Sequence, residues 1–310
     1  MTSFSARALE FRDRGFVTVK GLLPKSEAET YVRHLERLSG RTRESFDEFR
    51  VGRGFLRRGV YRGWTLPDGV SKTREFWDLL VHPELLGVVR EVLGPEACFL
   101  QHTDLHVGFS AVNWHRDSVS RRLGEGGDWD ESEEPYRLAR VGFYLQSHAE
   151  SRFALGLVPG SHRRGGALDE RGLVEVERRI RPWRQAVSLV LDRDVLSGRA
   201  EWVPAESGDA VVFDPRIVHS GSFIQGPKYS AFLAYGVPGR HFARHLHYYR
   251  HVRDELGYSA LHPELVERLR RAGLHADVDH LPHDPGASTY RPGQLQKLLG
   301  RRIRPGTRAA

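Results

Sequence analysis

The segment VNWHRDSVSRR, residues 112–122, places His115 and Asp117 two residues apart. If this segment is a strand, both side chains point into one cavity while Arg116 faces outward. One imidazole and one carboxylate make up two-thirds of a facial site of two histidines and one carboxylate, which binds Fe(II) and keeps open positions. The pair predicts a metal site that still lacks one ligand.

A third ligand is available far along the chain, in SGDAVVFDPRIVHSGS, residues 207–222. A turn at Gly208 and Asp209 begins a strand that runs to Phe213, and His219 lies beyond it. A jelly roll pairs an early strand with a late one, and so can bring His219 to the first two ligands. Histidine and aspartate ligands favour iron, whereas thiolates would favour zinc.

Other interpretations of these residues are weaker. A protein kinase needs an asparagine five residues after the aspartate of HRD, but Arg122 stands there, and the chain has no DFG motif or glycine-rich phosphate loop. The segment HSGS lacks the G-x-S-x-G motif of serine hydrolases. A surface histidine beside a charge pair, or a non-catalytic metal- or nucleic-acid-binding β-barrel, stays as an alternative. The scattered histidines are not expected to be ligands: His102, His106 and His162.

The elements that must position these ligands are short β segments that follow Ala97. Many short strands separated by turns favour a sandwich, jelly roll or barrel, so we predict a mainly β core over residues 96–240 with flanking helices. In ARVGFYLQ, residues 139–146, alternation places Val141, Phe143 and Leu145 on an apolar face and Arg140, Gly142, Tyr144 and Gln146 on a face toward a polar cavity. The predicted strands are CFLQHTDLHVG, VNWHRD, ARVGFYLQ, FALGLVPG, AVSLVLD, DAVVFD, VHSGSF and YSAFLAYGV.

Helices are expected on both sides of this core, and we predict one domain over residues 1–310. Residues 1–95 form an N-terminal helical buttress, with a strand at 16–23, a helix from Pro24 to Gly40, an irregular stretch at 41–70 and two helices, EFWDLLVH and PELLGVVREVLG. The glycine-rich and then acidic residues 118–138, which include Trp129, are long enough to be a lid. Residues 241–310 are predicted as a helical extension with the helices HPELVERLRRAG and PGQLQKLLGRR.

Composition excludes several other classes of protein. The 310 residues contain 47 Lys+Arg and 40 Asp+Glu, a net charge of +7, but the basic residues are dispersed and no DNA-binding module accompanies them. We therefore expect no nucleic-acid partner. A single cysteine, Cys98, rules out an intramolecular disulfide. No signal core and no apolar run of about 20 residues are present, so we expect no membrane partner and a cytoplasmic location.

The chain resembles the phytanoyl-CoA dioxygenase family of non-haem Fe(II), 2-oxoglutarate-dependent oxygenases. The resemblance rests on the order of GFVTVKGLLPKSEAE, HPELLGVVREVLGP, FLQHTDLHV, NWHRD, LVPGSHR, GDAVVFDPRIVHSGS and PKYSAFLAYG. It implies a double-stranded β-helix (a cupin-like jelly roll), with His115, Asp117 and His219 as iron ligands. It also implies 2-oxoglutarate and O₂ as cosubstrates and a small-molecule substrate.

The resemblance further implies a cation for the far carboxylate of 2-oxoglutarate. The family usually has arginine at the head of the last core strand, where Lys228 stands in this chain, with Ser230 two residues on. Gln101 is a further candidate contact. A carboxylate at Asp117 disfavours halogenation, because related halogenases have glycine or alanine there. The resemblance implies hydroxylation, oxidative cyclisation, desaturation or epimerisation of a substrate, which we expect to be a specialised metabolite; the oligomeric state is not indicated.

Overall fold

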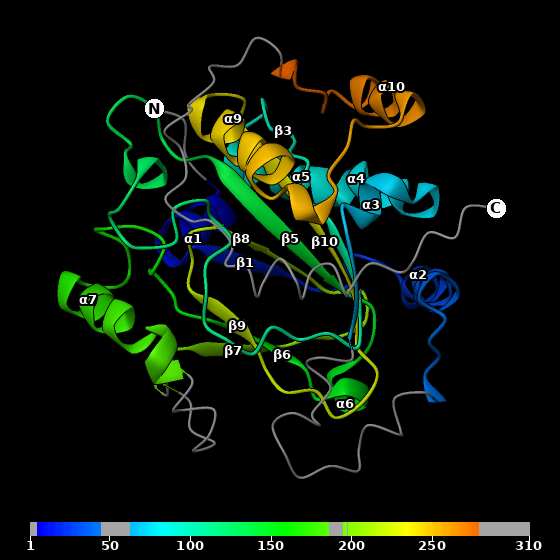
Figure 1. The fold of residues 1–310 in the computed structure, drawn as a ribbon, viewed down its shortest axis with the longest axis horizontal. Coiled ribbons are helices and arrows are strands. Elements are labelled where there is room, and N and C mark those ends of the chain that lie inside the picture. The colour runs from blue at the N-terminus through cyan, green and yellow to red at the C-terminus, as the bar shows by residue number, and fades with distance from the viewer. Residues whose placement is uncertain (1–4, 45–62, 186–194, 197, 279–310) are drawn as a thin grey trace.

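The computed structural model describes residues 5–44, 63–185, 195–196 and 198–278 (Figure 1). Its first third is helical except for two short strands: α1 (Ala6–Arg14), β1 (Phe16–Val19), α2 (Lys25–Ser39), β2 (Trp64–Pro67), α3 (Gly69–Lys72), α4 (Trp77–Leu80) and α5 (Pro83–Leu93). As predicted, α2 begins directly after Pro24 and ends at Gly40, whose φ of 66° lies in the left-handed region that favours glycine. No described helix combines the length and the apolar character needed to cross a bilayer.

A seven-stranded antiparallel sheet forms the larger layer, in the order β1-β8-β5-β10-β4-β2, with β3 paired to β10. Its remaining strands are β3 (Cys98–Phe99), β4 (Asp104–Val107), β5 (Leu138–Tyr144), β8 (Ala210–Phe213) and β10 (Tyr229–Gly236). A smaller sheet has the order β7-β6-β9, made of β6 (Ala154–Leu157), β7 (Glu201–Pro204) and β9 (His219–Gly221). Figure 1 shows the small sheet beside one end of β5 and β10.

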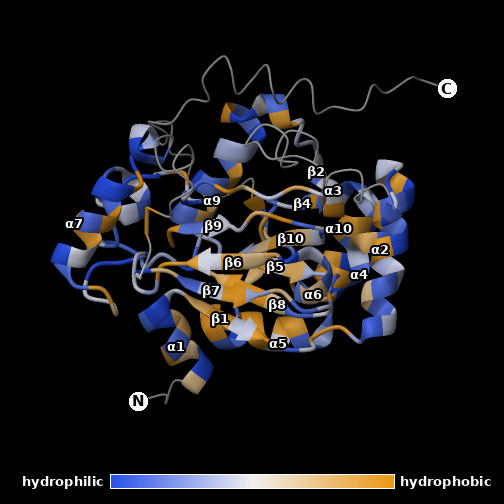
Figure 2. Ribbon diagram, turned by 90° about the horizontal axis from the view of Figure 1, so that it is seen from below, coloured by the Kyte–Doolittle hydropathy of each residue, from blue (hydrophilic) through white to orange (hydrophobic). Residues whose placement is uncertain are grey.

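The predicted alternation along β5 is confirmed, because its two faces enter different clusters. Val141 and Phe143 pack in the main hydrophobic core with residues of α2, α4 and α5. Tyr144, on the opposite face, packs with Phe153 and Leu155 of the small-sheet region. The large sheet therefore has one face against helices and the other against the small sheet. In Figure 2 the hydrophobic colour concentrates on β1 and α5, while α7 (Glu170–Arg179) is mostly hydrophilic.

Several expectations need correction. The chain is not mainly β: helical residues outnumber strand residues among those described, because α7, the short α6 (His148–Ser151), α9 (Arg240–His247) and α10 (Pro263–Arg271) add to the N-terminal helices. Residues 41–70 are not wholly irregular, since β2 and the start of α3 fall there. VNWHRD is not a strand but contributes one isolated bridge, from His115 to His219. The predicted helix at 263–271 is confirmed, whereas AVSLVLD and PGQLQKLLGRR lie outside the described residues.

Candidate metal centre

His115, Asp117 and His219 come together, as the two motifs predicted. His115 Nε2 lies 3.7 Å from Asp117 Oδ1, and His219 Nε2 lies 3.8 Å from Asp117 Oδ2. One ligand atom from each residue can be chosen so that all three lie within 4.8 Å of one another. This arrangement is compact enough for one metal ion to bind all three side chains, with ligand bonds of about 2 Å.

Backbone pairing produces this convergence. The amide of each histidine donates to the other's carbonyl oxygen at 3.0 Å, so residues 115 and 219 lie directly opposite each other. The amides of Asp117 and Ser118 both donate to the carbonyl of Pro215, at 2.8 and 2.9 Å. The HRD segment and the segment before β9 are therefore bonded along their length, which fixes the ligands relative to one another.

The protonation states suit metal binding. Nδ1 of His115 lies 2.7 Å from the carbonyl oxygen of Asn113, and Nδ1 of His219 lies 3.0 Å from that of Ile217. When Nδ1 carries the proton and donates it to that carbonyl, the lone pair of Nε2 is free for a metal. Burial lowers the pKa of His115 to about 4 and also lowers that of His219, so both rings are neutral at pH 7.

Asp117 remains ionised in the same surroundings. Burial by itself would raise its pKa, but His219, Arg140 and His115 together outweigh burial and hold the pKa below the ordinary value. The two histidines contribute only in their protonated forms, at acid pH, whereas Arg140 is positively charged throughout. Two neutral imidazoles and one carboxylate are the donor set of a facial iron site. The residues present thus fit the metal that the motifs implied.

Arg140 is a site residue that was not among the predicted candidates. Its Nε lies 3.3 Å from Asp117 Oδ2, and its Nη2 lies 2.9 Å from Asp104 Oδ2. Its Nη1 donates to the carbonyl oxygen of His102. The alternation of β5 had placed Arg140 on the cavity face, and that signal could have identified it.

Arg116 points away from the ligands but not toward solvent, so the expectation that it faces outward was wrong. Only 1% of the residue is exposed. Its guanidinium forms an ion pair with Glu177 of α7 at 2.5 Å and donates to the carbonyl oxygen of Arg216 at 2.7 Å. The ring of Trp129 lies 5.3 Å from it and 5.6 Å from the Arg216 guanidinium. Loop 118–138 and α7 cover this arginine and bury it.

Lys228 and Ser230 lie between the two sheets, at the start of β10. The ammonium of Lys228 donates to Ser230 Oγ at 3.0 Å and lies 4.4 Å from the ring centre of Phe153. None of the ion pairs in the described part of the chain includes Lys228, and burial lowers its pKa to about 7. Tyr144 is paired with Ser230 in the sheet, and its buried hydroxyl has no hydrogen-bond partner. A buried ammonium, with an unsatisfied hydroxyl on the neighbouring strand, is suited to a carboxylate ligand.

Gln101, the third predicted cosubstrate contact, is hydrogen-bonded to other residues of the protein. Its amide nitrogen donates to Asp68 Oδ2 at 2.9 Å and to the carbonyl of Ser259 at 2.8 Å, and its oxygen accepts two hydrogen bonds from Arg250. These contacts use every polar atom of the side chain. Gln101 therefore joins the segment before α3 to the C-terminal part of the chain.

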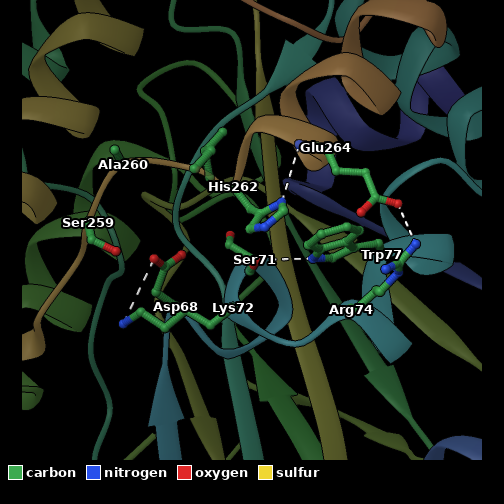
Figure 3. A pocket seen from close by; sticks show the side chains of 10 residues that line it. Asp68, Ser71, Lys72, Arg74, Trp77, Ser259, Ala260, His262 and Glu264 are labelled. Carbon is green, nitrogen blue, oxygen red and sulfur yellow. Dashed lines mark hydrogen bonds and ion pairs between the residues drawn. The ribbon is translucent and has the colours of Figure 1, made fainter.

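A cavity of about 360 Å³ lies at that junction (Figure 3). Its charged residues are paired: Arg74 with Glu264 of α10 at 2.5 Å, and Lys72 with Asp68 of the same segment at 3.9 Å. Trp77 Nε1 donates to the carbonyl of Ser71 at 3.0 Å. Because these groups bind one another, we interpret the cavity as a seam between α3, α4 and the segment leading to α10.

The sequence model of the phytanoyl-CoA dioxygenase (PhyH) family matches residues 11–229. The chain belongs to this family. The PhyH match contains all three predicted ligands and Lys228, and it ends one residue before Ser230. A search of the curated proteins found no match.

Among solved structures, the PhyH chain is similar to EctD from S. alaskensis in its apo form, with 18% identity over 76% of this chain and 77% of that chain, at a TM-score of 0.50. It is also similar to the carbocyclase SnoK from nogalamycin biosynthesis, with 18% identity over 76% and 85% and a TM-score of 0.49. HygX from Streptomyces hygroscopicus, solved with nickel and 2-oxoglutarate, has 20% identity over 76% and 88% and a TM-score of 0.49. The likeness to EctD concerns the fold alone.

Proposed function

We propose that this PhyH-family chain is an Fe(II)- and 2-oxoglutarate-dependent dioxygenase that oxidises a small organic substrate. The observation that carries the proposal is the convergence of His115, Asp117 and His219, with both histidines neutral and the aspartate ionised. Three protein ligands on one side of an iron ion leave positions for a chelating cosubstrate and O₂. When bound, iron, 2-oxoglutarate and O₂ supply the oxidation of a C–H bond, with succinate and CO₂ as coproducts.

The protein's own contribution is to bind and orient these groups in a dry interior. We propose that the ammonium of Lys228 binds the far carboxylate of 2-oxoglutarate, with Ser230 Oγ and the unsatisfied Tyr144 hydroxyl beside it. Lysine gives a point charge instead of the bidentate fork of arginine, so Ser230 and Tyr144 supply the directional contacts. The aromatic ring of Phe153 lies 4.4 Å from the ammonium, and we propose that it keeps water from competing for the carboxylate.

We propose that the two facing sheets form the double-stranded β-helix of this enzyme class, in one domain spanning residues 1–310. The support is that the bridge between His115 and His219 continues the small sheet, while Arg140 of the large sheet reaches Asp117. Loop 118–138 is proposed as the lid of the site. The support is that the loop follows directly on Asp117, one of the three converging residues.

The reaction that we favour is hydroxylation, with cyclisation, desaturation and epimerisation as variants of the same hydrogen abstraction. The proposed substrate is a polar specialised metabolite, because segments 41–70 and 118–138 are rich in arginine, aromatic and acidic residues. Halogenation is not proposed, since Asp117 retains the carboxylate that an added halide would have to replace.

The test is succinate formation from 2-oxoglutarate with Fe(II), in air and under argon, over a panel of candidate small molecules. We expect O₂-dependent succinate above background, stimulated by a true substrate, and none from an Asp117→Ala variant. Equal succinate from both proteins would contradict the proposal, because the product would then not depend on the metal site.

A further inference from the structure

Arg140 is held in one position by three separate contacts. The residue is 3% exposed, and its guanidinium bridges two carboxylates, those of Asp117 and Asp104, while the third nitrogen donates to the carbonyl of His102. Guanidinium is planar, stays charged at every relevant pH and presents its donors in a fixed fork. The hydrogen bonds to Asp104 and to the carbonyl of His102 therefore keep Arg140 beside Asp117, with which it forms an ion pair but no hydrogen bond from Nε.

The contact distinguishes the two oxygens of Asp117. Oδ2 lies 3.3 Å from the Arg140 Nε and 3.8 Å from His219 Nε2, whereas Oδ1 lies 3.7 Å from His115 Nε2. A carboxylate can bind a metal ion through one oxygen or through both. An oxygen that is held by a guanidinium is less available to a metal, so the contact favours binding through Oδ1 alone.

The number of oxygens that bind has a direct consequence for the reaction. An octahedral iron site has six positions, of which three would go to the protein and two to a chelating 2-oxoglutarate. The last position is the one that O₂ needs. If Asp117 bound through both oxygens, the sixth position would be filled and O₂ would be excluded.

We propose that Arg140 is a positioning residue that keeps Asp117 a single-oxygen ligand and thereby reserves one iron position for O₂. The inference rests on the proposed function, since it concerns the same iron site. Arg140, a residue of β5, would thus control how Asp117 binds the metal, which the three ligands do not determine by themselves. Arg140 itself need not touch iron, cosubstrate or substrate.

The experiment uses nitric oxide as a stand-in for O₂ on the anaerobic Fe(II) protein, with binding followed by the electron paramagnetic resonance signal of the iron–nitrosyl complex. Wild type should bind nitric oxide both with and without 2-oxoglutarate. Arg140→Gln should bind it without 2-oxoglutarate, when two further positions are free, but at least tenfold more weakly once 2-oxoglutarate is present. A merely structural defect would weaken both states alike.

Three further variants separate the effect of Arg140 on the position of Asp117 from its effect on folding. Arg140→Gln leaves the buried Asp104 carboxylate without its partner, so the double variant with Asp104→Asn serves if the single one does not fold. Asp104→Asn alone keeps Arg140 on Asp117 through the remaining contact to the carbonyl of His102, and its nitric oxide affinity should stay within twofold of wild type. Arg140→Lys retains a cation and should recover part of the affinity.

Cobalt(II) substitution gives a second readout, because the intensity of its visible bands falls as the coordination number rises. With 2-oxoglutarate bound, Arg140→Gln should have weaker bands than wild type. Equal nitric oxide affinity and equal cobalt spectra in the wild type and both glutamine variants would overturn the role of Arg140. If wild-type protein instead fails to bind 2-oxoglutarate at Fe(II), the proposed function fails, and the two failures are thereby distinguished.

Discussion

Replacing Lys228 by methionine should weaken 2-oxoglutarate binding by about 100- to 4000-fold. The ammonium is buried, donates to Ser230 Oγ at 3.0 Å and is in no ion pair within the described residues. Removing one partner of a buried charge pair costs about 3–5 kcal/mol, and each 1.4 kcal/mol changes a dissociation constant about tenfold. Methionine has a similar length and no charge, so the pocket keeps its shape.

The same substitution should stabilise the protein in the absence of cosubstrate. Burial lowers the pKa of Lys228 from 10.5 to about 7, which corresponds to at most about 5 kcal/mol against the charged form. Between these two pH values the unfolded chain binds the extra proton, so wild-type stability rises with pH across that window. The advantage of the methionine variant should therefore be largest below pH 7 and should shrink toward pH 10.5.

Isothermal titration calorimetry with Fe(II) under argon measures the binding. Wild-type affinity should fall about tenfold per pH unit above pH 7, because the neutral amine must first take up a proton. Lys228→Met should lack this dependence, and Lys72→Met is a matched control that should bind as wild type does. A methionine variant that binds 2-oxoglutarate within threefold of wild type would refute the assignment of Lys228 as the anchor.

Three further outcomes are expected. His115→Ala should lose stoichiometric Fe(II) binding, measured by metal analysis after gel filtration, while His162→Gln should retain it; iron retained by the alanine variant would exclude this histidine as a ligand. Tyr144→Phe should raise the free energy of unfolding by about 1 kcal/mol, because a buried hydroxyl without a partner is removed. The same variant should weaken 2-oxoglutarate binding about fivefold. Unchanged affinity would show that this hydroxyl does not contact the cosubstrate. Trp129→Leu should lower the free energy of unfolding by about 2–3 kcal/mol, measured by chemical denaturation. It should also speed proteolytic cleavage within residues 118–138. A cleavage rate equal to that of wild type would show that the ring does not anchor the loop.

The three converging side chains could be singled out because much of their signal is local. His115 and Asp117 are two residues apart, and His219 follows a strand that begins at a Gly-Asp turn. Two histidines and one aspartate, without a thiolate, then favoured iron over zinc as the metal. The pairing of residues 115 and 219 is a long-range contact, and it was inferred from the type of fold rather than from the spacing.

Alternation along β5 was equally informative about which side chains enter the core. It correctly placed Val141 and Arg140 on opposite faces of the strand. Side chains of a strand alternate between its two faces irrespective of what packs against them. The ion pair of Arg140 with Asp117 depends on how the HRD segment crosses the large sheet. Neither the HRD segment nor β5 carries a sequence pattern that predicts this arrangement.

Arg116 and Gln101 show where such reasoning stops. Arg116 does point away from the ligands, but α7 and loop 118–138 fold over it, and neither the position of α7 nor the ion pair with Glu177 follows from local pattern. Gln101 precedes β4 in a polar context, yet its partners Asp68, Ser259 and Arg250 come from three distant segments. Burial of a polar side chain is decided by such tertiary partners.

The most direct test of the central claim is an anaerobic titration of the Fe(II) protein with 2-oxoglutarate, followed by visible absorption. The account predicts a weak charge-transfer band that saturates at one 2-oxoglutarate per bound iron in wild type and fails to form in Asp117→Ala. Protein that binds one Fe(II) but develops no band at saturating 2-oxoglutarate, and forms no O₂-dependent succinate, would contradict it.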